Sequence, residues 1–326
     1  MFLKCVQELE SAPRSIVIIV AKDFIETSEG LIFAVVSSGT EQDQVLCFLR
    51  YIKIDSVWNK FTTEPANAYL KQHHPDYLHY SAVLDAHLHA VPLTRIVKHH
   101  RPKQRLQDLM QAKQHDAIES DLFELCSLLQ QSGLDLSQTG ITGSLLIGAQ
   151  QASSDIDLVC YSRTAFHQCR DITRELIKLQ HLHELDEQDW QASYQRRSCD
   201  LSYSDYVWHE RRKYNKAVIN GRKFDLNFID ETLKPDLANY QKCEVISLEC
   251  IITDDTQGFD YPAEFKIEHE QIDAIVSFTA TYTGQALKGE TVQVSGVVEQ
   301  NQHGIKRIVV GSSREAHGEY IRVLRV

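Results

Sequence analysis

The segment from Thr142 to Tyr161 constrains the fold of this chain more than any other. It reads Thr-Gly-Ser-Leu-Leu-Ile-Gly-Ala-Gln-Gln-Ala-Ser-Ser-Asp-Ile-Asp-Leu-Val-Cys-Tyr, and its end, from Ile156, is an apolar run that predicts a buried strand. Asp155 and Asp157 lie two positions apart where that strand begins, so their side chains point to the same face. A fold built around this segment must place two carboxylates together at the edge of its apolar core.

Two neighbouring carboxylates disfavour each other's charged form unless a cation lies between them. Mg²⁺, or Mn²⁺ in its place, is the expected cation, because it prefers hard oxygen ligands and commonly joins carboxylates to substrate phosphates. Gly143 and Ser144 lie upstream, at the expected start of a helix, where backbone N–H groups and a hydroxyl suit a phosphate. With Ser144 eleven residues before Asp155, the segment predicts adjoining phosphate and cation sites.

This pattern of Gly-Ser, a spacer and Asp-x-Asp resembles the signature of the DNA polymerase beta nucleotidyltransferase superfamily. The resemblance implies a third carboxylate on a later strand. Asp225, in Arg222-Lys-Phe-Asp-Leu-Asn-Phe-Ile229, has that context, while Asp230 lies past the expected end of the strand. The stretches 205–216 and 311–320 resemble a family of predicted nucleotidyltransferases known mainly from archaeal genomes, and this resemblance covers nearly the whole chain.

The superfamily resemblance implies a reaction and a role for each motif residue. The enzyme would transfer a nucleoside monophosphate from a nucleoside triphosphate, ATP in the first place, to a hydroxyl or phosphate acceptor. Asp155, Asp157 and Asp225 would be the catalytic residues and would hold the metal ions, and Asp225 would serve as general base or as a ligand of the second metal. Gly143 and Ser144 would bind the triphosphate.

Two basic residues are added to the nucleotide site on spacing alone. Arg212 and Lys216 lie four positions apart on an expected helix before the hairpin, so they would share a face and reach a phosphate. Two other functions remain open on the same fold. One is an inactive module that binds a nucleotide or another protein, and the other is a hydrolase that releases inorganic phosphate.

The chain divides by sequence texture into three expected domains of a multidomain α/β (α+β) protein. Residues 1–105 predict a mixed α/β domain, 106–238 the catalytic domain with a polymerase-beta-like mixed sheet and flanking helices, and 239–326 an all-β barrel or sandwich. An oligonucleotide-binding-type barrel is one option for the last. The expected strands are 15–21, 31–36, 44–52, 156–161, 217–219, 223–229, 244–253, 263–267, 273–283, 291–298, 305–310 and 320–324.

Helices are expected where apolar residues recur with a helical period. Ile118, Leu122, Leu125 and Leu129 form one stripe, which should end near Gly133. A second stripe runs from residue 166 to 179, and a short helix is expected at 65–70. The dipeptide Asn220-Gly221 predicts a tight hairpin, because both residues tolerate positive φ.

Charge and composition restrict the partners. The net charge of −11 opposes general nucleic-acid binding, although the run of five basic residues from Arg95 to Arg105 mildly favours an RNA acceptor. No apolar run approaches the roughly 20 residues of a membrane span, and the start lacks an export signal, so we expect a cytoplasmic protein without a membrane partner. None of the eight cysteines forms a C-x-x-C pair, so reduced thiols are expected.

Histidine and tryptophan offer further candidates. His87 and His89 would share a strand face and could suit zinc, but no cysteine joins them at ligand spacing and Asp85 is the one nearby carboxylate, so polar surface histidines are the preferred interpretation. The pairs at 73–74 and 99–100 are interpreted in the same way. Trp208, beside a basic stretch, is the tryptophan to test for stacking on a nucleobase.

Overall fold

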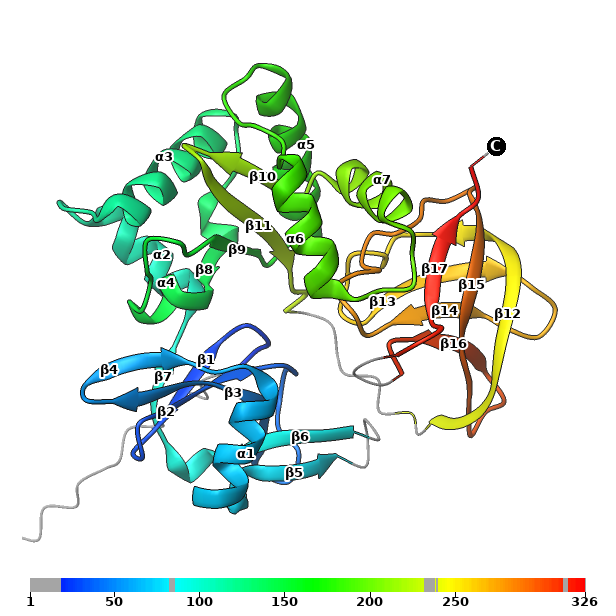
Figure 1. Cartoon of the computed structure of the whole chain (residues 1–326), viewed down its shortest axis with the longest axis horizontal. Helices are drawn as coiled ribbons and strands as arrows, with labels where there is room; N and C mark the ends of the chain where they lie inside the picture. The colour runs from blue at the N-terminus through cyan, green and yellow to red at the C-terminus, as the bar shows by residue number, and fades with distance from the viewer. Residues whose placement is uncertain (1–18, 82–85, 232–237, 239, 313–315, 326) are drawn as a thin grey trace, which may run out of the picture.

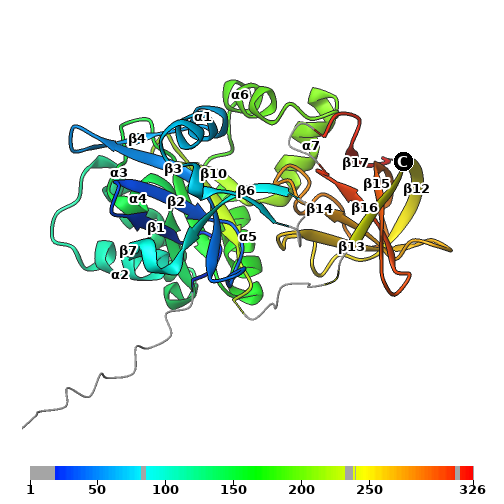
Figure 2. The same ribbon diagram turned by 90° about the horizontal axis from the view of Figure 1, so that it is seen from below.

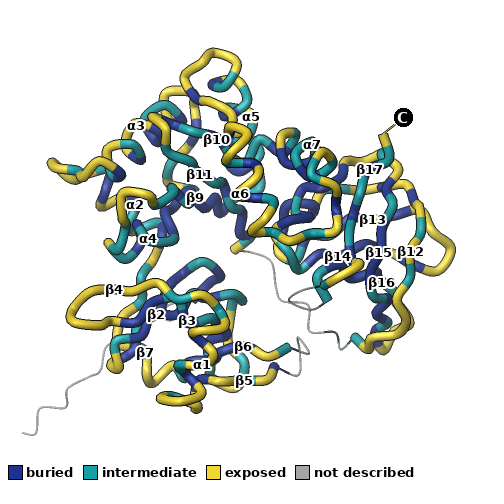
Figure 3. Tube along the Cα trace, in the orientation of Figure 1, coloured by how far each residue is buried: buried dark blue, intermediate teal, exposed yellow. Residues whose placement is uncertain are grey.

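The computed structural model describes residues 19–81, 86–231, 238, 240–312 and 316–325, and these form three β-sheets with helices packed on them (Figure 1). The chain is therefore a multidomain α+β protein, as the sequence predicts. Buried residues concentrate along the strands of each sheet (Figure 3). Within the described ranges, no helix is long and apolar enough to cross a membrane.

The first sheet has seven strands and is antiparallel throughout. Its order is β5-β6-β3-β2-β1-β7, with β4 paired to β3. Helix α1 covers it, placing Ala66 and Leu70 in a core with Ile25, Leu31 and Phe33. The elements are β1 (Phe24–Thr27), β2 (Leu31–Val35), β3 (Gln44–Ile54), β4 (Val57–Lys60), α1 (Thr63–His73), β5 (Leu78–Ser81), β6 (Ala86–Pro92) and β7 (Ile96–His100), with 3-10 turns at Pro75–Tyr77 and Leu93–Arg95.

The prediction of a strand at 15–21 is wrong for the residues that the structure describes. The segment 15–21 was expected to be extended and paired; residues 15–18 lie outside the described residues, and 19–21 form a loop. The loop ends in a left-handed turn at Lys22, which has a φ of 74°. The apolar run is used for packing against the central sheet, with Val20 and Ala21 buried beside Val159.

The central sheet has the order β10-β11-β9-β8, in which β9 and β11 are parallel and the other pairs are antiparallel. Its helices cover an apolar core that includes Ile118, Leu122, Leu125 and Leu129, as predicted. The elements are α2 (Pro102–Gln111), α3 (Ala117–Gln131), a 3-10 turn (Leu136–Gln138), β8 (Thr139–Thr142), α4 (Gly143–Ile147), β9 (Ile156–Cys160), α5 (Arg163–Lys178), α6 (Glu187–Arg197), α7 (Tyr203–Lys213), β10 (Lys216–Ile219) and β11 (Arg222–Phe228).

Local signals explain where these elements begin and end. Asp116 and Glu119 form a capping box at the start of α3, and Gly133, with a φ of 98°, follows its end as expected. The predicted hairpin is confirmed: Asn220 and Gly221 have φ values of 50° and 78° and join β10 to β11.

The third sheet closes on itself. Its strands run β12-β13-β14-β16-β15, and pairing of β12 with β15 completes the ring, while β17 adds to β15. The pairing therefore favours a barrel over a sandwich. All six expected strands are present, the third being shorter than predicted: β12 (Tyr240–Asp254), β13 (Ala263–Glu268), β14 (Ala274–Ser277), β15 (Thr291–Asn301), β16 (Lys306–Val310) and β17 (Tyr320–Val323).

The three sheets are joined by shared apolar contacts. Trp190 of α6 and Tyr206 of α7 lie in one apolar core with Phe265 of the barrel. In a separate contact, Leu146 of α4 packs with Tyr51 of the first sheet. Figure 2 shows the first sheet in front of the central one, and it is this contact that positions the site described next.

Candidate active site

Two of the predicted carboxylates lie side by side on neighbouring strands. Asp157 on β9 and Asp225 on β11 are direct Cα partners in the parallel pairing. Their strands alternate regularly, so that Phe224, Leu226 and Phe228 of β11 are buried in the core while Asp225 is on the opposite, partly exposed face. The prediction that Asp225 lies on a strand is therefore confirmed, and Asp157 lies on the neighbouring strand as expected, whereas Asp155 precedes β9 and is not part of it.

Gly143 lies directly against one of these carboxylates. It has a φ of 68°, and a Cβ atom placed on it would lie 2.5 Å from Oδ2 of Asp157. Thr142, the residue before it, is the antiparallel partner of Asp157. Glycine is required here twice, for the backbone conformation and for the close approach. The structure thus brings the Gly-Ser segment and the Asp-x-Asp segment together.

The helix that follows is short. Helix α4 has five residues, so its dipole and free N–H groups offer less to a phosphate than the sequence suggested. Ser144 is its second residue and is partly exposed. A phosphate site beside the carboxylates must therefore draw on side chains from elsewhere in the chain.

The carboxylates disfavour one another's charge. Burial, together with the neighbouring Asp225 and Asp155, raises the pKa of Asp157 to about 6, although Lys22 acts in the opposite direction. Burial also raises the pKa of Asp155, against the effect of Lys223. Groups held in this way take up a proton or a cation more readily than an exposed aspartate does.

The chemistry of this donor set fits a hard divalent cation, with Asp157 and Asp225 as adjacent oxygen ligands. The coordination site is, however, incomplete. Among the residues that the structure describes, no three acidic, His or Cys side chains are already gathered as a metal site. Asp155, which precedes β9, is the third predicted ligand.

Basic side chains from three parts of the chain surround the carboxylates closely enough to act on their charge or on one another. Lys216, expected at the nucleotide site, and Lys223, not expected there, come from the central hairpin. The others were missed, because no local signal marks them. They are Lys22, Arg50 and Lys60 of the first domain and Arg196 and Arg197 at the end of α6.

The expected helical pair Arg212 and Lys216 is wrong. Helix α7 ends at Lys213, and Lys216 is the first residue of β10, where it is the Cα partner of Asp225. Arg212 points to the barrel, and its Nη2 donates to both oxygens of Glu290, at 2.6 and 2.7 Å. The structure brings Lys216 to the carboxylates and holds Arg212 elsewhere.

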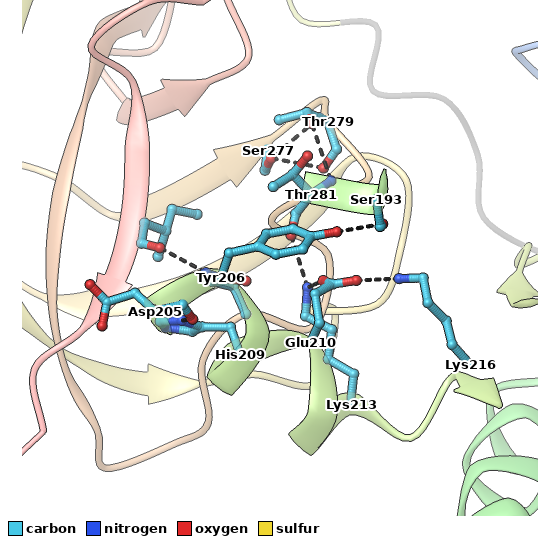
Figure 4. A network of polar contacts seen from close by, with 12 residues as sticks. Ser193, Asp205, Tyr206, His209, Glu210, Lys213, Lys216, Ser277, Thr279 and Thr281 are labelled. Carbon is cyan, nitrogen blue, oxygen red and sulfur yellow. Dashed lines mark hydrogen bonds and ion pairs between the residues drawn. The ribbon is translucent and has the colours of Figure 1, made fainter. Parts of the chain in front are cut away.

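A buried ion-pair network fixes Lys216 (Figure 4). Its Nζ donates to Oε2 of Glu210, whose Oε1 accepts from Nζ of Lys213 at 2.5 Å. Lys213 also donates to the carbonyl of Thr281 in the barrel, at 2.8 Å. Burial alone would raise the pKa of Glu210, but the two lysines lower it to about 2, so it is ionised.

A small cavity lies beside this network. It measures about 40 Å³ and is lined by Asp155, Asp225, Lys216, Lys223 and residues of α6 such as Arg196. Ligand pockets usually run to several hundred Å³. A nucleotide bound at the carboxylates would therefore need α6 to shift.

The remaining candidates have structural roles. Trp208 lies under two guanidinium groups, with Arg212 and Arg325 at 4.5 and 5.2 Å from its ring centre, so its faces are used. His89 is buried, contrary to the surface interpretation: its Nδ1 accepts from the Leu49 N–H at 2.8 Å, and burial lowers its pKa to about 4. His99 and His100 pair with Asp23 and Glu26. Asp85 lies outside the described residues.

The basic run 95–105 is largely engaged. Three of its five basic side chains form ion pairs, with distances of 3.2, 2.7 and 3.1 Å: Arg95 with Asp76, Lys103 with Glu231, and Arg105 with Glu119. Such pairing leaves less positive charge for a nucleic acid than the sequence alone suggests.

Fold and site together define a multidomain α+β protein with a carboxylate cluster enclosed by basic residues. The chain is similar to Uncharacterized protein MJ1086 of Methanocaldococcus jannaschii, to which it is 31% identical over 337 residues, covering 93% of this chain and 98% of the relative. It belongs to the family of that archaeal protein. No family model and no solved structure matches the chain.

Proposed function

We propose that this protein is a metal-dependent nucleotidyltransferase with a polymerase-beta-like core. The observation that carries the proposal is the register of Asp157 against Asp225 on parallel strands, with Gly143 pressed against the Asp157 carboxylate. Carboxylates with a raised pKa, next to basic side chains, suit a complex of a divalent cation and a triphosphate. The archaeal relative carries no functional name, so the proposal rests on the site.

The proposed reaction joins a nucleoside monophosphate to an acceptor hydroxyl or phosphate. The acceptor oxygen bonds to the α-phosphorus, the bond from that phosphorus to the bridging oxygen breaks, and pyrophosphate leaves. Asp225 takes the acceptor proton, or acts as ligand to a second metal. Mg²⁺ or Mn²⁺ held by Asp155, Asp157 and Asp225 would neutralise charge at the phosphates and acidify the acceptor.

For the acceptor, we propose a chemical class, a hydroxyl or phosphate group, and not one molecule. A five-stranded barrel is the architecture of many oligonucleotide-binding domains, which supports an RNA acceptor. The outward residues of β13 alternate Glu264, Lys266 and Glu268, so this face is not basic. Together with the engaged run 95–105, this favours small hydroxyl or phosphate acceptors at least as much as RNA.

Transfer of label tests the proposal. Wild type, Asp157→Asn and Asp225→Asn are incubated with α-labelled nucleoside triphosphates, Mg²⁺ or Mn²⁺ and either total RNA or a small-molecule extract. We expect labelled product from wild type and a loss of at least about 1000-fold in both variants, because each removes a metal ligand. Asp171→Asn, an exposed aspartate on α5, is the matched control and should retain full activity. Equal labelling by all four proteins would refute the enzyme.

The small cavity supports one alternative, a module that binds a nucleotide without turnover. Such a module would bind triphosphate in an Asp157-dependent manner and yield no labelled product with any acceptor. A hydrolase would release inorganic phosphate, and product analysis separates it from both.

A further inference from the structure

The first domain lies on the carboxylate face of the central sheet. Val159 follows Asp157 by two positions on β9 and shares its face. Val20 and Ala21 are buried against Val159 and Ile229. The residue after Ala21 is therefore delivered along the same face, next to the carboxylates.

That residue, Lys22, is held by two hydrogen bonds of its backbone. Its backbone is left-handed, with a φ of 74°, an unusual conformation for a lysine that its surroundings must stabilise. Its N–H donates to the carbonyl of Val35 at 3.0 Å, and its carbonyl accepts from Oγ1 of Thr142 at 2.9 Å. Thr142 precedes α4, and its hydroxyl does not cap that helix but binds Lys22.

The ammonium group of Lys22 ends among the functional side chains. Its Nζ donates to Oδ1 of Asn227 at 3.2 Å, and Asn227 follows Asp225 by two positions on the same face of β11. Asp157 and Asp225 act on its charge and favour the ammonium form, against burial, which lowers the pKa of Lys22. A cation from another domain thus stands beside two carboxylates on which a metal would bind.

A second cation near Lys22 has a buried nitrogen that could donate a hydrogen bond to a ligand. Arg197, at the end of α6, is close enough to act on the charge of both Lys22 and Lys216. Its Nε is buried, and within the described part of the chain it has no hydrogen-bond partner. A buried guanidinium nitrogen without an acceptor is costly unless a ligand supplies one. An anion lying between Lys22 and Arg197 would do so.

We propose that the first domain is part of the active site and that Lys22, together with Arg197, binds the terminal phosphates of the triphosphate. The inference rests on the proposed function for the identity of that anion. Lys22 is the binding residue that the first domain contributes, held by its backbone contacts to Val35 and Thr142. Before substrate and metal bind, its ammonium partly balances the carboxylates.

Two binding measurements test this role, and they should move in opposite directions. Removing the ammonium in Lys22→Met should weaken the affinity for inorganic tripolyphosphate in excess Mg²⁺ about tenfold or more, since one charge-assisted contact is lost. It should also tighten the binding of Mn²⁺ alone, because a competing positive charge is gone. A variant that is merely damaged would weaken both.

Three further variants distinguish the loss of the ammonium group from damage to the fold. Lys22→Gly removes the side chain and suits the left-handed backbone, so it should fold and bind as Lys22→Met does. Lys22→Arg should keep tripolyphosphate binding within a few-fold of wild type. Lys53→Met, an exposed lysine on β3 of the first domain, is the control and should change neither affinity. Wild-type tripolyphosphate affinity in Lys22→Met and Lys22→Gly would overturn the proposal.

The two proposals fail separately. If wild type transfers no nucleotide but loses tripolyphosphate affinity on Lys22→Met, the anion site stands and the reaction is wrong. If wild type is active and Lys22→Met keeps its KM and kcat for the triphosphate, the reaction stands and the role of Lys22 is wrong.

Discussion

Gly143→Ala perturbs the candidate site in the most calculable way. A methyl group at Gly143 would lie 2.5 Å from Oδ2 of Asp157, well inside contact distance, so the carboxylate must move. The φ of 68° adds a conformational cost of about 1 kcal/mol for alanine. We expect a loss of about 1–3 kcal/mol in the free energy of unfolding and a fall of about 100-fold in activity, the usual cost of a displacement near 1 Å at a reacting centre.

The chain contains a matched control for this variant. Gly148 also has a φ of 68°, and a Cβ placed there meets nothing within 4 Å. Gly148→Ala should therefore lose about 1 kcal/mol and keep its activity. Urea unfolding and the initial rate of pyrophosphate release measure the two quantities. If Gly143→Ala matches Gly148→Ala in both, the carboxylate does not lie against Gly143 as described.

Three other outcomes are expected. The pKa of Asp157 is raised to about 6 from 3.8, so the metal-free fold loses stability as the pH rises between these values. Asp157→Asn should therefore raise the free energy of unfolding in urea at neutral pH by up to about 3 kcal/mol, and a destabilised variant would contradict this. The pKa of Glu210 is lowered to about 2 from 4.5, which contributes stability that is present above pH 4.5 and lost as the pH falls towards 2. Glu210→Gln should therefore lower the free energy of unfolding by about 3 kcal/mol at pH 7 and make it depend less on pH between 4.5 and 2. An unchanged pH dependence in this range would contradict the prediction. Arg212→Met should lose about 1 kcal/mol through the Glu290 contact and leave the KM for the triphosphate unchanged, whereas a raised KM would restore Arg212 to the nucleotide site.

Some positions of the candidate site could be predicted from the sequence and others could not. Asp157 and Asp225 could be placed because strand alternation and the Asn-Gly hairpin are local signals, and the two strands then paired in register. Arg212 and Lys216 were misplaced because the end of a helix is poorly marked. The left-handed residue that ends α7 is Tyr214, not a glycine.

Lys22 and Arg197 could not be predicted at all. The two residues come close to each other from segments more than a hundred positions apart, and Lys22 reaches the carboxylates through its hydrogen bond to Asn227 of the central sheet. Periodicity in the sequence carries no information about which loop of one domain lies on which sheet of another. The same holds for Glu210, whose helix connects the central sheet to the barrel.

Asp225 is the carboxylate whose role depends most on the proposed chemistry, and one measurement tests that role directly. Wild type and Asp225→Asn are compared for pyrophosphate released from a nucleoside triphosphate in the presence of the acceptor fraction that wild type labels, with Mg²⁺ and with the metal chelated. We expect release by wild type when Mg²⁺ is present and not when the metal is chelated, and a loss of at least about 1000-fold in Asp225→Asn. Equal release by the two proteins, or wild-type release of inorganic phosphate in place of pyrophosphate, would contradict it.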